Sequence, residues 1–331
     1  MNPRLLIALA LGLGASASAE AQVSGGEPVR VEQSWGALAG TLVVPPTANG
    51  PAPVVLLIAG SGPTDRDGNS RALPGKNDAY RLLAEALARE GVASLRYDKR
   101  GVGESRPTVP LVESDIRFEM MVDDAAALVG VLRKDARFSR VIVAGHSEGS
   151  LVGILAARQA QADGFVSIAG VARRATDVIR DQLKPQIGAV PTLWEQNESV
   201  LVSIEAGTAM TPLPPMIQAI PGLAALYRPS VQPYLISWTR YVPATEMATL
   251  KVPITLVQGT TDIQVSVDEA RALKAAAPAA TLVIVEGMNH VMKMAPADRA
   301  ANVATYGNPD LPIVPDVPRA IVALARSLGP R

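Results

Sequence analysis

The most constraining feature of this chain is a serine between two glycines, placed where a strand-like run meets a helix-like one. Residues 145–149 read GHSEG; the apolar run VIVA precedes them and SLVGILAARQA follows. In this context, G-x-S-x-G predicts a tight turn that lifts the hydroxyl of Ser147 above a sheet. Side chains at Gly145 and Gly149 would collide there, because strand and helix approach closely. The alternative interpretation is an ordinary β-to-α loop.

Apolar runs alternate with amphipathic stretches along most of the 331 residues. Two short β-like runs around Trp35-Gly36, within 29–45, predict a hairpin. Continuous aliphatic runs predict buried strands, and helical periodicity fills much of the sequence between them. The predicted strands are 53–60, 92–98, 141–145, 164–170, 254–259 and 281–287; the predicted helices are 78–91, 116–132, 150–160, 267–277 and 317–328. This alternation predicts an α/β fold with a mostly parallel central sheet flanked by helices.

One local signal fixes the start of a helix. Ser266 and Glu269 have the S-x-x-E spacing of a capping box, in which each side chain binds a backbone N–H of the first turn. We therefore expect the helix over 267–277 to begin at Ser266, with both side chains engaged in the cap.

Residues 171–250 interrupt the alternation. They hold no clear buried strand, but helical stretches, scattered prolines and two of the three tryptophans. Loops beyond the carboxyl ends of parallel strands line the ligand crevice of such sheets. We therefore predict a helical cap inserted into a core formed by 22–170 and 251–331, with Tyr234 and Trp238 in the substrate pocket. The alternative is a decorated edge of the core without a role in ligand binding.

A serine hydroxyl becomes a useful nucleophile only when a base accepts its proton. The chain has two histidines and no cysteine. His146 is adjacent to Ser147, but neighbouring side chains diverge in a tight turn, so we assign it a structural role. His290, in a short loop after the predicted strand 281–287, is therefore the predicted base.

The imidazole of His290 needs an acid to fix its tautomer and stabilise its charged form. Asp262 follows the predicted strand 254–259 directly and is the predicted acid. The order Ser147, Asp262, His290 is the chain order of α/β-hydrolase triads. Each of the three residues follows a different predicted strand.

Acyl transfer also requires hydrogen-bond donors for the oxyanion that develops on the substrate. One is the backbone N–H after the nucleophile, which belongs to Glu148. The other comes from the glycine-rich loop 60–69, where we assign the N–H of Ser61, with Gly62 as the alternative. The carboxylate of Glu148 would oppose the oxyanion. We therefore expect it to turn away and to be held by a cation or by hydrogen-bond donors.

Two glycine-rich runs carry charges that we interpret as structural. The two aspartates of loop 60–69 lack a third ligand, so we predict internal hydrogen bonds and ion pairs there and no metal site. The run YDKRGVGES, residues 97–105, lacks the glycine spacing of phosphate-binding or dinucleotide-binding motifs. We expect Arg100 in this run to pair with Asp98 or Glu148.

Composition and the N-terminus narrow the class of protein. Basic and acidic residues are equal at 31 each, so no basic excess indicates a nucleic-acid partner. A chain without cysteine has no disulfides, no cysteine-bound zinc and no thiol nucleophile. Arg4, a short apolar run and the pattern Ala17-Ser18-Ala19 predict a signal peptide over 1–21, cleaved after Ala19 or Ala21. We therefore expect an exported chain, periplasmic or secreted in a bacterium, without a stable membrane anchor after cleavage.

Several motifs together resemble the α/β-hydrolase superfamily from about residue 30 onwards. They are GSGPTDRDGN, YDKRGVGES, GHSEG, GTTDIQV and MNH, with YRPSVQPYLISWTRYVP in the predicted cap. Within the superfamily they look like bacterial EstD-type and dienelactone-hydrolase-like carboxylesterases. The resemblance implies an α/β-hydrolase fold and hydrolysis of short to medium acyl esters through an acyl-enzyme on Ser147, with Asp262 as acid, His290 as base and no cofactor. One departure is Ala59-Gly60, where the commonest pattern has His-Gly, and it bears on the second oxyanion donor.

Two alternatives remain open on the sequence. A serine aminopeptidase, amidase or thioesterase would use the same fold. An aminopeptidase would need acidic residues in the cap to hold the substrate's amino group, and Glu195, Glu198 and Glu205 are available there. A non-catalytic protein that binds a small ligand would have no need of a complete triad.

Overall fold

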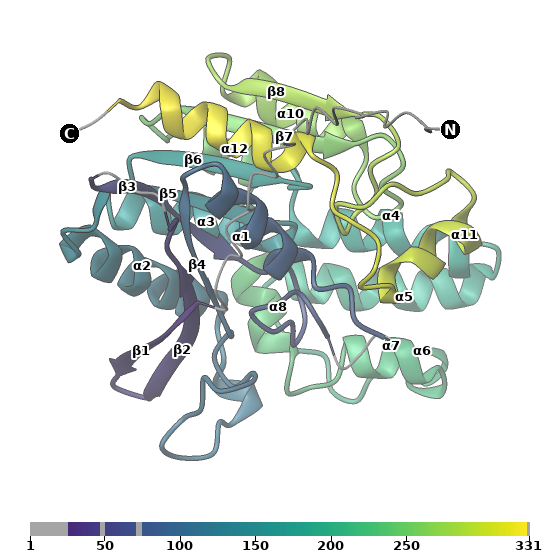
Figure 1. The fold of residues 1–331 in the computed structure, drawn as a ribbon. Coiled ribbons are helices and arrows are strands. Elements are labelled where there is room, and N and C mark those ends of the chain that lie inside the picture. The colour runs from purple at the N-terminus through teal and green to yellow at the C-terminus, as the bar shows by residue number, and fades with distance from the viewer. Residues whose placement is uncertain (1–25, 47–49, 71–74, 330–331) are drawn as a thin grey trace, which may run out of the picture.

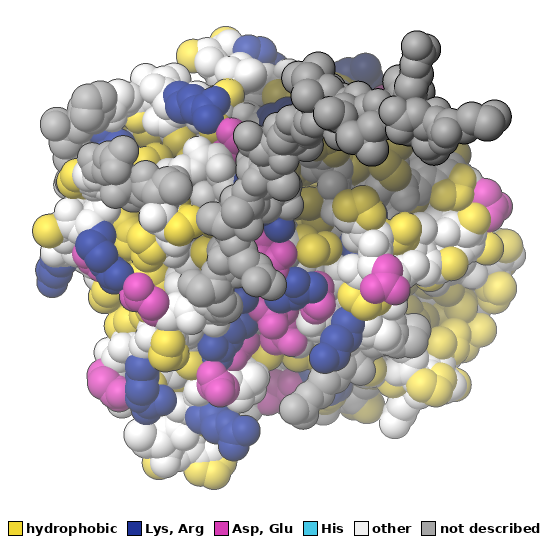
Figure 2. All heavy atoms as spheres, in the orientation of Figure 1, with side chains coloured by type: hydrophobic (Ala, Val, Ile, Leu, Met, Phe, Trp, Pro, Cys, Tyr) yellow, Lys and Arg dark blue, Asp and Glu magenta, His cyan; other side chains and the backbone are white. Residues whose placement is uncertain are grey.

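The computed structural model describes residues 26–46, 50–70 and 75–329 (Figure 1). The signal peptide predicted over 1–21 lies outside the described residues. None of the helices in the described ranges has the length and apolar character needed to cross a membrane. On the face shown in Figure 2, acidic and basic side chains are interspersed, in keeping with the equal totals of the two charges.

Eight strands form one sheet in the order β1-β2-β4-β3-β5-β6-β7-β8. β3 to β8 run parallel to one another, and β2 pairs antiparallel with both β1 and β4. The strands are β1 (Glu27–Gln33), β2 (Gly36–Val43), β3 (Ala52–Ile58), β4 (Ala93–Tyr97), β5 (Phe138–His146), β6 (Gly164–Ile168), β7 (Ile254–Gly259) and β8 (Thr281–Val285). The predicted hairpin and the mostly parallel sheet are confirmed.

Helices cover both faces of the sheet (Figure 1). Val54 and Leu56 of β3 point into one apolar cluster, while Val55 and Leu57 point into another on the opposite face. This burial on both sides explains why the parallel strands read as continuous aliphatic runs. The first cluster includes α2 (Phe118–Lys134), α3 (Glu148–Gln159) and α10 (Val267–Ala276); the second includes α1 (Ala79–Arg89) and α12 (Asp316–Ser327).

The predicted capping box of α10 is wrong. Ser266 is the residue before the helix, but its side chain makes no capping hydrogen bond. Glu269 is buried and its carboxylate accepts from the backbone N–H of Ala172 at 2.7 Å and from Arg173 Nε at 2.6 Å. The carboxylate therefore holds the segment that leaves β6, a tertiary contact that replaces the local one.

Residues 171–250, all of them described, contain a run of helices between β6 and β7. They are α4 (Ala175–Ile187), α5 (Pro191–Glu205), α6 (Pro215–Ala219), α7 (Pro221–Leu226), α8 (Gln232–Trp238) and α9 (Pro243–Met247). From α5 to α9 each helix has proline in its first turn, where the missing N–H costs no hydrogen bond. The insertion has its own apolar cluster, which includes Val200, Ile217 and Tyr227.

Shorter helices lie outside the insertion in the described chain. They are η1 (Glu113–Asp115), α11 (Arg299–Ala304) and η2 (Thr305–Gly307). The loops after β3, β5, β7 and β8 all leave the same edge of the parallel sheet, because the carboxyl ends of parallel strands coincide. These four loops carry the residues described next.

Candidate active site

The turn after β5 holds Ser147 in a conformation that side-chain-bearing residues rarely adopt, with φ 56° and ψ −123°. The N–H of Ser147 donates to the carbonyl of Ile168 in β6 at 2.9 Å and fixes the turn to the sheet. A Cβ at Gly145 would lie 2.0 Å from the carbonyl oxygen of Gly149. A Cβ at Gly149 would lie 2.5 Å from the carbonyl oxygen of Ile58 in β3. The predicted strained turn is therefore present, and close backbone packing requires both glycines.

Asp262 and His290 meet beyond the ends of β7 and β8. His290 Nδ1 lies 2.8 Å from Asp262 Oδ2. Asp262 Oδ1 accepts from the N–H groups of Gln264 and Val265 at 2.8 and 3.0 Å, and Gln258 Nε2 donates to Oδ2 at 3.2 Å. Burial raises the pKa of Asp262, but His290 and the backbone donors outweigh it and hold the pKa below its usual range. An ionised carboxylate at Nδ1 leaves Nε2 of the imidazole free to accept a proton.

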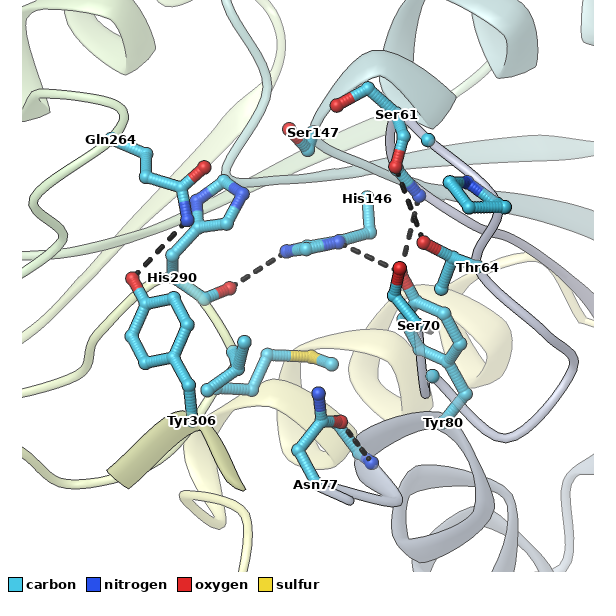
Figure 3. A pocket seen from close by; sticks show the side chains of 17 residues that line it. Ser61, Thr64, Ser70, Asn77, Tyr80, His146, Ser147, Gln264, His290 and Tyr306 are labelled. Carbon is cyan, nitrogen blue, oxygen red and sulfur yellow. Dashed lines mark hydrogen bonds between the residues drawn. The ribbon is translucent and has the colours of Figure 1, made fainter. Parts of the chain in front are cut away.

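Ser147 and His290 line the same pocket (Figure 3). Between the two side chains, both within the described residues, the structure has no hydrogen bond. Contacts between a nucleophile and its base commonly tighten only when substrate binds. The structure thus brings the predicted nucleophile and base to one cavity and places the predicted acid behind the base.

His146 lies buried beneath the turn and has a different environment. Its Nδ1 lies 2.9 Å from the hydroxyl of Tyr80, and its Nε2 lies 2.7 Å from the backbone oxygen of His290 (Figure 3). A carbonyl oxygen can only accept, so we assign the proton to Nε2, and Nδ1 accepts from Tyr80. Burial, and then the nearby His290, lower the pKa of His146 to about 3. This neutral ring, which is hydrogen-bonded at both of its nitrogens, has the structural role that the sequence predicted.

The two predicted oxyanion donors are backbone N–H groups of residues close to Ser147. Glu148 is the first residue of α3, so its N–H has no acceptor within the helix. Ser61 lines the pocket, and its N–H has no acceptor among the described residues. Gly60 packs so closely on the nucleophile that a Cβ there would lie 3.1 Å from Ser147 Cβ. The donor role of these two N–H groups stays a prediction, and both residues lie next to the Ser147 turn in the structure.

The carboxylate of Glu148 is buried and held by the insertion. Its Oε1 accepts from the hydroxyl of Tyr234 in α8 at 2.9 Å. Burial, followed by the charge of Glu148, raises the pKa of Tyr234 well above its ordinary value, so the phenol remains a donor. The expectation that hydrogen-bond donors hold this carboxylate is confirmed.

The pocket has a volume of about 260 Å³ and an uncharged lining. Uncharged polar side chains supply much of it, and the apolar part includes Pro63, Val291 and Met292. Apart from the two histidines, none of its described lining residues is ionisable at neutral pH. Besides Ser147 and Tyr80, the uncharged polar side chains of the lining are Ser61, Thr64, Ser70, Asn77, Gln264 and Tyr306.

Tyr234 and Trp238, the predicted pocket residues, do not line this pocket. Trp238 stacks on Phe118 of α2, with ring centroids 6.1 Å apart and planes 7° from parallel. Tyr234 binds Glu148 of α3. Their aromatic surfaces join the insertion to the helices of the core, so the prediction that they form the pocket around Ser147 does not hold.

The predicted partner of Arg100 is also wrong. Arg100 pairs with Asp124 of α2 at 2.7 Å and lies over the ring of Trp35 at 4.3 Å. Asp98 is occupied by Arg66, whose Nη2 lies 2.6 Å away. The described residues contain no group of three or more His, Asp or Glu side chains that could hold a metal ion.

Sequence reasoning missed two residues that bind the loop after β3, which carries the predicted oxyanion donor Ser61. The hydroxyl of Tyr80 accepts from the N–H of Gly60 at 3.2 Å, and Lys99 Nζ donates to the carbonyl of Gly60 at 2.5 Å. Tyr80 looks in the sequence like any residue of a helix face. Lys99 offered a weak signal, since it follows β4, the strand that pairs with β3 ahead of Gly60.

Comparisons with known proteins find similar sequences and similar folds. A family model described as serine aminopeptidase, S33, matches residues 75–199. Esterase EstD of Thermotoga maritima is 37% identical over 148 residues, which are 44% of this chain and 34% of that protein. The match therefore spans about a third of the length of this curated relative.

Solved structures of similar architecture cover most of the chain. Est1E from Butyrivibrio proteoclasticus is 16% identical, has a TM-score of 0.56, and aligns over 91% of this chain and 99% of its own. A thermophilic esterase from Thermogutta terrifontis is 17% identical, with a TM-score of 0.53 over 91% and 99%. At these identities the likeness concerns the fold. Together, the matches confirm the resemblance that the sequence motifs indicated.

Proposed function

We propose that this chain, which has the α/β-hydrolase fold, is a serine hydrolase that cleaves neutral carboxylic esters with short to medium acyl groups. One observation carries the proposal: Ser147, on a strained turn, shares a pocket with His290, whose Nδ1 contacts a buried aspartate at 2.8 Å. The similarity to a protein named as an esterase supports the same reaction class.

In the proposed reaction, Ser147 Oγ attacks the ester carbonyl while His290 Nε2 accepts its proton. The N–H groups of Glu148 and Ser61 donate to the oxyanion of the tetrahedral intermediate. His290 then protonates the leaving alcohol, and an acyl group remains on Ser147. Water, deprotonated by His290, releases the carboxylic acid, and Asp262 stays ionised throughout to stabilise the imidazolium.

The charges of the insertion favour an ester over a peptide with a free amino terminus. An aminopeptidase must hold an ammonium group, and the described lining of the pocket offers no carboxylate. Glu198 and Glu205 both pair with Arg180, at 2.9 and 2.6 Å. Glu195 is exposed and does not line the pocket. The acidic residues that kept the aminopeptidase alternative open are therefore absent from the described lining.

The test is turnover of p-nitrophenyl esters and aminoacyl anilides by the wild type and two serine variants. We expect acetate and butyrate esters to be cleaved, and Ser147→Ala to lower kcat by about 10⁵–10⁶-fold. Ser150→Ala is the matched control, because this buried hydroxyl in the first turn of α3 bonds to Ser167 at 2.7 Å and does not line the pocket. Substantial ester turnover by Ser147→Ala would refute the nucleophile, and faster cleavage of anilides would favour the aminopeptidase.

We also propose that the mature chain is exported. The support is the N-terminal pattern of Arg4, an apolar run and Ala17-Ser18-Ala19. Expression in a bacterium, fractionation and N-terminal sequencing would test it. A periplasmic product that begins at Glu20 or Gln22 is expected, and a cytoplasmic product that begins at Met1 would contradict it.

A further inference from the structure

Two side chains hydrogen-bond to the backbone of the same residue, Gly60, one at its N–H and the other at its carbonyl. The hydroxyl of Tyr80 accepts its N–H at 3.2 Å, and the ammonium of Lys99 donates to its carbonyl at 2.5 Å. Lys99 is only 8% exposed, so this bond is made away from solvent. Tyr80 also donates to His146, and Figure 3 shows this bond in the pocket that Ser61 and Ser147 line.

The bond to Lys99 decides where the next N–H points. A trans peptide is planar, so the carbonyl of Gly60 and the N–H of Ser61 point in opposite directions. With the carbonyl directed at the buried ammonium, the N–H of Ser61 must point the other way. Gly60 packs against the Cβ of Ser147 and Ser61 lines the pocket, so that direction is the one in which the substrate carbonyl would lie.

We propose that Lys99 is a positioning residue for catalysis, whose ammonium fixes the Gly60–Ser61 peptide so that the N–H of Ser61 serves as the second oxyanion donor. The inference rests on the proposed esterase function and deepens it. It also bears on the Ala59-Gly60 sequence, which stands where the commonest pattern has His-Gly. In this chain a lysine at the end of the neighbouring strand orients the donor.

The electrostatics of the site support this role. A positive charge on a peptide carbonyl polarises the peptide and strengthens the N–H at its other side as a donor. Burial lowers the pKa of Lys99, and the charge of Glu148 opposes that change. Burying an ammonium is costly, and an apolar side chain of similar volume would pack at lower cost. The side chain of Lys99 makes one hydrogen bond in the described structure, and that bond orients Gly60. This lysine is therefore better explained by positioning than by packing.

The first test is Lys99→Met, which keeps the volume and removes the donor. We expect kcat for p-nitrophenyl butyrate to fall by about 10- to 100-fold, somewhat less than the loss of an oxyanion donor itself. KM should change by less than about threefold, because the lost interaction acts in the transition state. Affinity for an aryl trifluoromethyl ketone, which forms an oxyanion with the serine, should fall in parallel with kcat/KM.

Lys274→Met is the matched control. Lys274 also donates to backbone carbonyls, those of Pro278 and Ala280 at 2.7 and 2.5 Å, but it lies in α10 and does not line the pocket. We expect this variant to keep kcat and inhibitor affinity within about twofold of the wild type. Wild-type kcat in folded Lys99→Met would overturn the proposal.

A second test does not depend on the folding of Lys99→Met. Because the chain has no cysteine, Lys99→Cys introduces its only thiol. Alkylation of the unfolded variant with 2-bromoethylamine restores an ammonium on a chain as long as that of lysine, whereas 1-bromopropane gives the same shape with a methyl group. After refolding, with rates normalised to the folded fraction by circular dichroism, the aminoethyl form should be at least about tenfold faster. Equal rates of the two forms would overturn the proposal.

The outcomes also separate this inference from the function on which it rests. Ester turnover that survives in Ser147→Ala would defeat the proposed function, whatever Lys99 does. An inactive Ser147→Ala beside a fully active Lys99→Met would defeat only the role of Lys99.

Discussion

The helical insertion and the loops at the carboxyl edge of the sheet differ in whether their polar groups have partners within the protein. In the insertion, Arg180 of α4 pairs with Asp177, Glu198 and Glu205, so one guanidinium holds three carboxylates. At the sheet edge, by contrast, the N–H groups of Ser61 and Glu148 have no acceptor among the described residues.

The difference shows how a rigid site keeps unsatisfied groups open to a ligand. At the edge, buried side chains bind the far side of each active group: Asp262 holds His290, His146 holds the backbone of His290, and Lys99 holds Gly60. Each of these groups is thus held on the side away from the pocket, and its side toward the pocket stays available to a ligand. In the insertion the charged groups are satisfied by one another, which stabilises its shape. Changes at the edge should therefore lower turnover, with or without a change in stability, whereas changes in the insertion should lower stability alone.

Asp262→Asn should give the largest effect of the three changes that test this contrast. An amide can donate to Nδ1 of His290 and would favour the tautomer that leaves no acceptor for the serine proton. We expect kcat at neutral pH to fall by about 10³–10⁴-fold, measured on p-nitrophenyl butyrate. A loss below about tenfold would show that the carboxylate does not orient the base.

His146→Gln tests the structural histidine through the pH dependence of stability. The pKa of His146 is lowered to about 3 in the folded chain, against roughly 6.5 when unfolded. Between these values the unfolded state binds a proton and the folded state does not, so stability falls as pH falls. We expect wild type to lose about 1.4 kcal/mol per pH unit more than the variant between pH 6 and 4. Urea unfolding at several pH values measures this, and parallel curves would contradict it.

Arg180→Met should have the smallest effect and should act on stability. It leaves Glu198 and Glu205 without their shared cation, in a partly buried setting, and we expect a loss of about 1–2 kcal/mol. Ester turnover should stay within about twofold. Arg271→Met is the control, because the Arg271–Asp268 pair is exposed and its removal should change stability by less than about 0.5 kcal/mol. A large fall in kcat for Arg180→Met would break the division between the two regions.

The fold was predictable because its signals are local. Buried parallel strands are apolar on both faces, as Val54 and Val55 of β3 illustrate, and that pattern needs no knowledge of the partner strand. The turn around Ser147 was predictable for a steric reason, since Gly145 and Gly149 leave a sequence signal where backbones nearly touch.

The supporting contacts were not predictable because they depend on where distant elements meet. Glu269 had the spacing of a capping box, but its carboxylate binds the N–H of Ala172, which lies after β6 and 97 residues earlier in the chain. Tyr234 looked like a pocket residue and holds Glu148, 86 residues away. Spacing along the chain describes the first turn of a helix well, but it carries no information on which helix packs beside it.

The backbone of Ser147 has a consequence for any effort to make this protein more heat-resistant. A residue held at φ 56° costs of order 1–3 kcal/mol, and glycine adopts such a conformation at little cost. Ser147→Gly would relieve part of that strain, offset to some degree by the greater freedom of glycine in the unfolded chain. The proposed nucleophile thus occupies a position where stability and turnover favour different residues. Selection for thermal tolerance alone would favour loss of the serine, so a screen for hardier variants must score hydrolysis as well.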